Sequence, residues 1–180
     1  MSYQPKPGDI GLVGSNSLIG LFVRFGQVVV GDHSFVTHAF VVLHDGVVIE
    51  AMPGGAKFAT IDKYPDAVYS KYRLTQDQRD AICEAAIRME GIPYSFLDFL
   101  SIFLTHLVNK KWIPYKYSWL PQKVKNRVRE SGHMICSQLC AEAYRQAGVP
   151  ITKGLEEPMD LTPGDLARMV LQYNGEPLGE

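Results

Sequence analysis

The sequence has 180 residues, enough for one domain with a hydrophobic core. Hydrophobic residues make up 46% of it and charged residues 21%, and the formal net charge of -1 gives no overall attraction to nucleic acid or to an anionic membrane. The three cysteines show no disulfide spacing, which favours a reducing compartment or free thiols. The N-terminal segment has no signal-peptide pattern, so we expect a cytoplasmic protein.

The first third of the chain predicts strands and one helix. Residues 9–14 are predicted to form a short strand after a Pro-Gly turn, and residues 17–27 a helix with Ser17 as N-cap. Two β-branched runs follow, over residues 35–43 and 46–52, and His-Asp-Gly separates them. This order predicts a β-hairpin.

The rest of the chain predicts a further strand and several helices. We expect a strand over 68–74, followed by helices over 75–90, 96–108, 136–147 and 162–173. Helix signals support three of these: Thr75 and Thr162 as N-caps, and Gly91 and Gly148 after the last helical residues. This order of elements favours a single α+β domain over residues 1–180, with a small antiparallel sheet packed by helices.

The helix over 136–147 has a cysteine in its first turn. Free N–H groups and the positive end of the helix dipole stabilise a thiolate at Cys136, which makes this thiol nucleophilic near neutral pH. Cys140 lies one turn further in and lacks this effect, so we expect it to pack as a small hydrophobic residue. Cys83 occupies an apolar position in the middle of the helix over 75–90, and we expect it in the core.

A nucleophilic thiol needs a base, and the hairpin offers one. If residues 44–46 form a three-residue loop with Gly46 in the left-handed region, Phe40 lies opposite Glu50, and His38 is a diagonal neighbour of Glu50 on the same face. A two-residue loop would put them on opposite faces. The longer loop therefore predicts a carboxylate that orients an imidazole base, although a core histidine and a rim glutamate are the alternatives.

Several motifs resemble those of a known superfamily. They are PGDIGLV, THAFVVLHDGVVIEA, GIPYSFLDF, MICSQLCAEAY and TPGDLA, in this order over residues 5–170. Together they resemble the circularly permuted papain-like proteins related to the NlpC-type cysteine hydrolases, the YiiX-like group, and the related lecithin retinol acyltransferase-like proteins. In that superfamily the histidine strand precedes the cysteine helix. Residues 92–132 match only at GIPYSF and are interpreted as a family-variable insertion.

The resemblance implies a papain-like fold and a catalytic triad. Cys136 would be the nucleophile, His38 the base and Glu50 the orienting residue of a cysteine hydrolase, an amidase or peptidase, with thioesterase or acyltransferase activity as variants. Its substrate would be a peptide, an amide or an acyl lipid, with no cofactor and no metal, and we expect a monomer. Tyr94 and His133 are candidates for an additional oxyanion or substrate donor. A bacterial or phage origin would fit the family.

Two alternatives remain open at this point. His133, Cys136 and Cys140, with His38, offer metal ligands, although their spacing is not a familiar zinc pattern. A non-catalytic binding module is the second alternative, and it could associate with a membrane through the apolar, aromatic and basic segment 96–119. The sequence contains no nucleic-acid-binding motif, so we expect no nucleic-acid partner.

Overall fold

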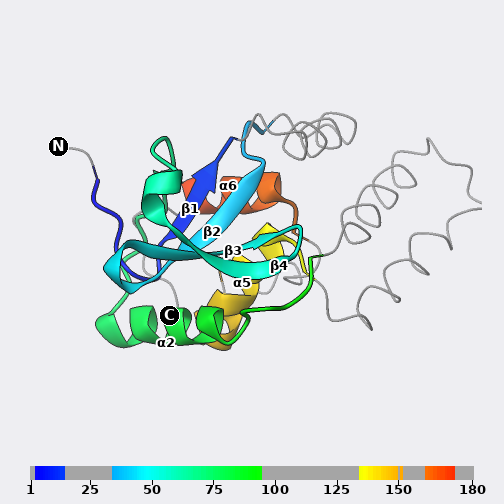
Figure 1. Cartoon of the computed structure of the whole chain (residues 1–180). Coiled ribbons are helices and arrows are strands. Elements are labelled where there is room, and N and C mark those ends of the chain that lie inside the picture. The colour runs from blue at the N-terminus through cyan, green and yellow to red at the C-terminus, as the bar shows by residue number, and fades with distance from the viewer. Residues whose placement is uncertain (1–2, 15–33, 95–133, 150, 152–160, 173–180) are drawn as a thin grey trace, which may run out of the picture.

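The computed structural model describes residues 3–14, 34–94, 134–149, 151 and 161–172. Within these residues, five strands form one antiparallel sheet and three helices accompany it (Figure 1). The sheet order is β4-β3-β2-β1-β5, and the strands are β1 (Ile10–Val13), β2 (His38–Val42), β3 (Val47–Met52), β4 (Gly55–Thr60) and β5 (Val68–Tyr69). The helices are α2 (Gln76–Ile87), α5 (Cys136–Gln146) and α6 (Pro163–Gln172). The predicted α+β class is confirmed, while the helices predicted over 17–27 and 96–108 lie outside the described residues.

The two last strands of the sheet differ from the sequence-based prediction. β4 was not predicted, yet it pairs with β3 along its whole length. β5 has only two residues, so the strand predicted over 68–74 is wrong in length. Beyond β5, the carbonyl of Tyr72 accepts a hydrogen bond from the guanidinium of Arg79 in α2. The ring of Tyr72 packs edge-on against that of Tyr144 in α5.

The sheet separates two hydrophobic clusters. The larger cluster joins one face of β1, β2 and β3 to the three helices, and it includes Leu12, Val41, Ile49, Leu139 and Leu166. The smaller cluster lies on the other face, where Val13, Phe40, Val42 and Val48 are covered by residues 59–69. The alternation of β2 therefore places Ala39 and Val41 in the larger cluster with the helices, and Phe40 and Val42 in the smaller cluster on the other face.

The hairpin between β2 and β3 has the predicted register. Phe40 pairs with Glu50, and the N–H of Leu43 donates to the carbonyl of Val47 at 2.8 Å. Gly46 has a φ of 71° and ends a three-residue turn, as predicted. This turn geometry fixes which residues of the two strands share a face.

Helix α5 is fixed at both ends. The hydroxyl of Ser137 donates to the carbonyl of Leu161 at 2.6 Å, just before α6. Near its other end, the hydroxyl of Tyr144 donates to the carbonyl of Gly8 at 2.6 Å. Gly148 follows the helix with a φ of 76°, as predicted. These contacts hold the first turn of α5 in a defined position relative to the sheet.

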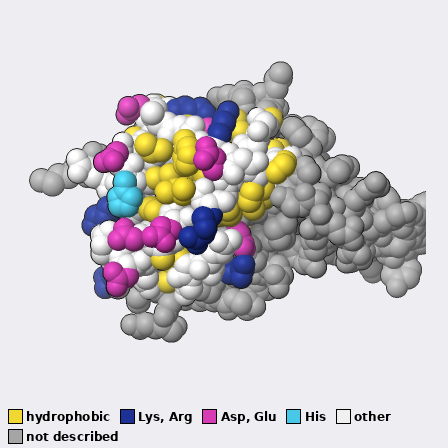
Figure 2. Space-filling view, turned by 60° about the horizontal axis from the view of Figure 1, so that its bottom comes forward, with side chains coloured by type: hydrophobic (Ala, Val, Ile, Leu, Met, Phe, Trp, Pro, Cys, Tyr) yellow, Lys and Arg dark blue, Asp and Glu magenta, His cyan; other side chains and the backbone are white. Residues whose placement is uncertain are grey.

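The described surface carries charges of both signs. Figure 2 shows a face on which acidic and basic side chains surround smaller groups of hydrophobic ones. Within the described part of the chain, no helix is long and apolar enough to cross a membrane. The segment 96–119, which was the alternative membrane-contacting region, lies outside this part.

Candidate active site

Cys136 is the first residue of α5, as the sequence predicts. The residue before it, Ile135, is the N-cap, and its aliphatic side chain cannot accept a hydrogen bond. Gln138 accepts from the Ile135 N–H at 2.9 Å, but within the described residues no side chain caps the first N–H groups of the helix. These N–H groups and the helix dipole favour negative charge beside the Cys136 thiol, which is only 3% exposed.

His38 and Glu50 lie on one face of the β2–β3 pair. His38 Nε2 and Glu50 Oε2 are 2.7 Å apart, and both side chains are buried. The predicted geometry is therefore confirmed. The alternative that Glu50 is a rim residue is wrong, because its side chain is 0% exposed. A buried carboxylate against a buried imidazole fixes the ring orientation and stabilises its protonated form.

The thiol of Cys136 lies close enough to the His38 imidazole to affect its charge. Burial alone would lower the pKa of His38, but the interactions with Cys136 and Glu50 outweigh it and raise this pKa to about 9. The structure thus brings Cys136, His38 and Glu50 together in that order, with an imidazole that holds a proton at neutral pH.

Glu50 has two further partners that the sequence did not predict. Lys63 Nζ donates to Glu50 Oε1 at 2.6 Å, and the Tyr64 hydroxyl donates to Glu50 Oε2. Burial would raise the pKa of Glu50, but hydrogen bonds from His38, Lys63 and Tyr64 lower it to about 2. Lys63 and Tyr64 follow β4, so their approach depends on a strand that local sequence patterns did not reveal.

The other two cysteines are placed differently from Cys136. Cys140 is 0% exposed, as expected for a packed core residue, and burial raises its pKa well above the usual range. Cys83 is also buried, in the middle of α2, and burial raises its pKa to about 11. Both thiols are therefore protonated at neutral pH and are poor nucleophiles.

The two predicted oxyanion donors have different outcomes. The backbone of Tyr94 pairs with Met134, two residues before Cys136, so Tyr94 lies beside the segment that leads into the site. His133 lies outside the described residues. Among the residues that the structure does describe, no group of three or more His, Cys, Asp or Glu side chains is placed to hold a metal ion.

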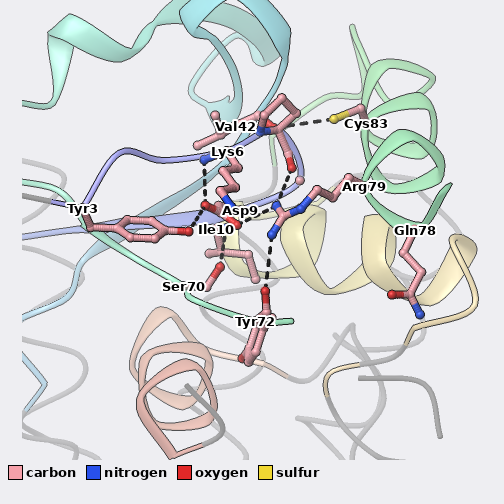
Figure 3. A network of polar contacts seen from close by, with 12 residues as sticks. Tyr3, Lys6, Asp9, Ile10, Val42, Ser70, Tyr72, Gln78, Arg79 and Cys83 are labelled. Carbon is pink, nitrogen blue, oxygen red and sulfur yellow. Dashed lines mark hydrogen bonds and ion pairs between the residues drawn. The ribbon is translucent and has the colours of Figure 1, made fainter. Parts of the chain in front are cut away.

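A second cluster of buried charges lies near the opposite end of β2. Asp9 accepts hydrogen bonds from the Tyr3 hydroxyl and from Arg79, whose guanidinium also donates to the carbonyls of Pro7 and Tyr72 (Figure 3). The sequence did not predict this cluster. It ties the segment before β1 to α2, and its polar groups are engaged with one another and with the backbone.

The fold and this site define an α+β protein in which a strand histidine pairs with a buried glutamate and interacts with a helix-terminal cysteine. No family model matches the chain, and no curated protein matches its sequence.

Proposed function

We infer that the protein is a cysteine-dependent hydrolase or acyltransferase, which acts on an amide or ester carbonyl of a peptide or acyl-lipid substrate. The observation that carries this inference is that His38 interacts both with Cys136, at the N-terminus of α5, and with Glu50. A thiol at a helix N-terminus, a base and an orienting carboxylate together are the parts that covalent acyl transfer requires.

The first half of the reaction is acylation of the thiol. Cys136 Sγ attacks the carbonyl carbon and forms a C–S bond, while its proton resides on His38. Negative charge develops on the carbonyl oxygen, and backbone N–H groups at the start of α5 stabilise it. The intermediate then expels the amine or alcohol, which takes the proton from His38, and a thioester remains on Cys136.

The second half is transfer of the acyl group. His38, now neutral, accepts a proton from water or from another acceptor, whose oxygen or nitrogen attacks the thioester carbonyl. The C–S bond breaks and releases the Cys136 thiolate. The proton on His38 then either returns to this thiolate or stays on the imidazolium, which pairs with the thiolate. Glu50 keeps the same ring orientation in both halves and stabilises the imidazolium whenever it forms.

The same inference extends to the fold. The histidine strand β2 precedes the cysteine helix α5 in the chain, and helices pack against an antiparallel sheet. This order is the one that the resemblance to circularly permuted papain-like, NlpC-type proteins implies. We therefore assign the domain to that fold as part of the proposal.

The test is a screen with electrophilic acyl probes, read by mass spectrometry of the intact protein. The proposal expects one acyl group per chain, located on Cys136, which hydroxylamine removes as it removes thioesters. The matched control is Ser137→Ala. Ser137 follows Cys136 in the sequence, but its hydroxyl donates to the carbonyl of Leu161. Acylation of Cys140 or Cys83 in place of Cys136 would overturn the proposal.

A further inference from the structure

Glu50 accepts more hydrogen bonds than the orientation of His38 requires. Its Oε2 accepts from both His38 and Tyr64, and its Oε1 accepts from Lys63 at 2.6 Å. The Glu50 side chain is 0% exposed, whereas that of Lys63 is 44% exposed. The carboxylate is therefore held from one side by the base and from the other by a cation that reaches it from the surface.

Aromatic packing fixes the position of Tyr64. Its ring stacks on Phe40 with centroids 4.7 Å apart and an interplanar angle of 20°, and it lies 5.8 Å from the ring of His38. Phe40 in turn covers Gly11 of β1, where an added Cβ would lie 2.2 Å from the ring. The absence of a side chain at Gly11 therefore lets Phe40 lie flat on the sheet and support Tyr64.

The charges of the site explain why a second cation is useful. Glu50 stabilises the imidazolium of His38, but its negative charge also disfavours a thiolate at Cys136, because like charges repel. The Lys63 ammonium offsets that repulsion. With Lys63 included, two positive and two negative groups balance when the thiolate–imidazolium pair is present.

We propose that Lys63 and Tyr64 are positioning residues of the active site: they hold the Glu50 carboxylate ionised and fixed against His38, and Lys63 balances the second negative charge that forms when Cys136 ionises. This extension rests on the proposed function. Lys63 and Tyr64 act through Glu50 and need no contact with the substrate.

Several titratable and charged groups surround His38 and affect its pKa. Glu50 faces it from β3, Cys136 from α5, and Tyr64 from the turn after β4. Lys63 acts through Glu50, and the exposed Lys57 of β4 pairs with Glu50 in the strand register. Removal of the Lys63 charge raises the pKa of His38, because a positive neighbour no longer opposes its protonation.

The experiment measures two quantities in the full chain: the rate of iodoacetamide alkylation of Cys136 against pH, and the titration of His38 by NMR. Lys63→Met removes the charge and keeps a long side chain, whereas Lys63→Arg keeps the charge. Lys71→Met, a lysine over the ring of Tyr3 near the other charge cluster, is the matched control. Tyr64→Phe removes only the hydroxyl and keeps the stacked ring.

We expect Lys63→Met to move both limbs of the alkylation profile, and the His38 titration, upward by about 0.5–1 pH unit. Lys63→Arg and Lys71→Met should overlay the wild type. Tyr64→Phe should raise the His38 titration, because Glu50 Oε2 then accepts from His38 alone. If Lys63 and Tyr64 had a purely structural role, their substitution would change the unfolding transition without moving the midpoints of the His38 titration or of the alkylation profile.

Failure of this proposal is separable from failure of the proposed function. If the His38 titration is the same in Lys63→Met, Tyr64→Phe and wild type, Lys63 and Tyr64 do not position the site, whatever Cys136 does. If Cys136 is no more reactive than Cys140 while the His38 midpoint still moves, the positioning is real and the catalytic assignment fails.

Discussion

Two buried ion pairs near opposite ends of β2 have the same degree of burial and different surroundings. In Glu50–His38 and in Asp9–Arg79 the carboxylate side chain is 0% exposed and the cationic side chain 9% exposed. The guanidinium of Arg79 also donates hydrogen bonds to the backbone carbonyls of Pro7 and Tyr72. His38 instead has a thiol, that of Cys136, as its second interaction partner. Burial of an ion pair therefore does not by itself distinguish a candidate active site from a structural ion pair. The second interaction partner of the cation distinguishes the two clusters.

Each ion pair also has a cysteine nearby, which sharpens the comparison. The Cys83 thiol lies near the Asp9–Arg79 pair and approaches the carbonyl of Val42 at 3.7 Å (Figure 3). Burial raises its pKa to about 11, and it lies in the middle of a helix. Cys136 lies at a helix N-terminus beside an imidazole. A cysteine near buried charges is thus not enough, because the thiol also needs a base and a helix end.

The largest expected effect is that of Cys136→Ala. It should abolish acyl-enzyme formation and turnover, because no other group in the site can form the thioester. Cys140→Ala and Cys83→Ala are the matched controls, and each should lower the free energy of unfolding by about 1 kcal/mol while turnover remains. Acylation is measured by mass spectrometry and folding by circular dichroism. Activity that survives in Cys136→Ala and disappears in Cys140→Ala would reverse the assignment.

The next effect is that of His38→Ala. Loss of the base, which is also the later acid, should lower turnover by about 10²–10⁴-fold. His44→Ala serves as the control, because His44 belongs to the same hairpin but is exposed in its turn, next to Asp80. Steady-state kinetics of both variants decide the matter, and equal effects of the two substitutions would remove His38 from the mechanism.

A matched pair of carboxylate-to-amide substitutions compares the two clusters directly. Glu50→Gln should lower turnover, but by less than His38→Ala does, because an amide still holds the His38 ring but cannot stabilise the imidazolium by charge. Asp9→Asn should instead lower the free energy of unfolding by about 3–5 kcal/mol, because it leaves the buried charge of Arg79 unpaired. Urea unfolding and turnover are measured for both variants. The comparison fails if Asp9→Asn impairs turnover of the folded protein as much as Glu50→Gln does.

The stability of the site cluster should depend on pH in two windows. The pKa of Glu50 is lowered to about 2 from an ordinary value of 4.5, so its contribution is full above pH 4.5 and is lost as the pH falls towards 2. The pKa of His38 is raised to about 9 from 6.5, so its contribution is full below pH 6.5 and is lost as the pH rises towards 9. Each window is worth about 3 kcal/mol, at about 1.4 kcal/mol per pKa unit, and the two are not additive because they share one ion pair.

Urea unfolding between pH 3 and pH 9 measures both windows. Glu50→Gln should flatten the acid window and reduce the alkaline one, since it removes the charge that both depend on. An unchanged pH profile in Glu50→Gln would show that the ion pair with His38 does not contribute to stability.

Local sequence patterns predicted the parts of the site that local geometry determines. A three-residue loop ending in Gly46 sets the register that puts His38 beside Glu50, and Gly148 limits the helix that begins at Cys136. The pairing of Asp9 with Arg79 spans 70 residues, and no periodicity or cap signals such a contact.

The unpredicted strand β4 explains why the rest of the site was missed. It begins at Gly55 and contains only Phe58 and Thr60 as strongly strand-forming residues, so its strand propensity is weak. Its pairing with β3 holds it in the extended conformation. Lys63 depends on β4 for its approach to Glu50. Tertiary pairing, and not local preference, therefore places the second cation.

The most direct test of the central claim is the relative reactivity of the three cysteines in the folded protein. Iodoacetamide labelling at neutral pH, followed by peptide mass spectrometry, gives a rate for each. The account predicts that Cys136 reacts fastest, because it lies at a helix N-terminus and interacts with an imidazole. Cys83 and Cys140 should react only on unfolding, because burial raises the pKa of both. Equal labelling of all three cysteines in the folded protein would contradict the assignment of Cys136 as the nucleophile.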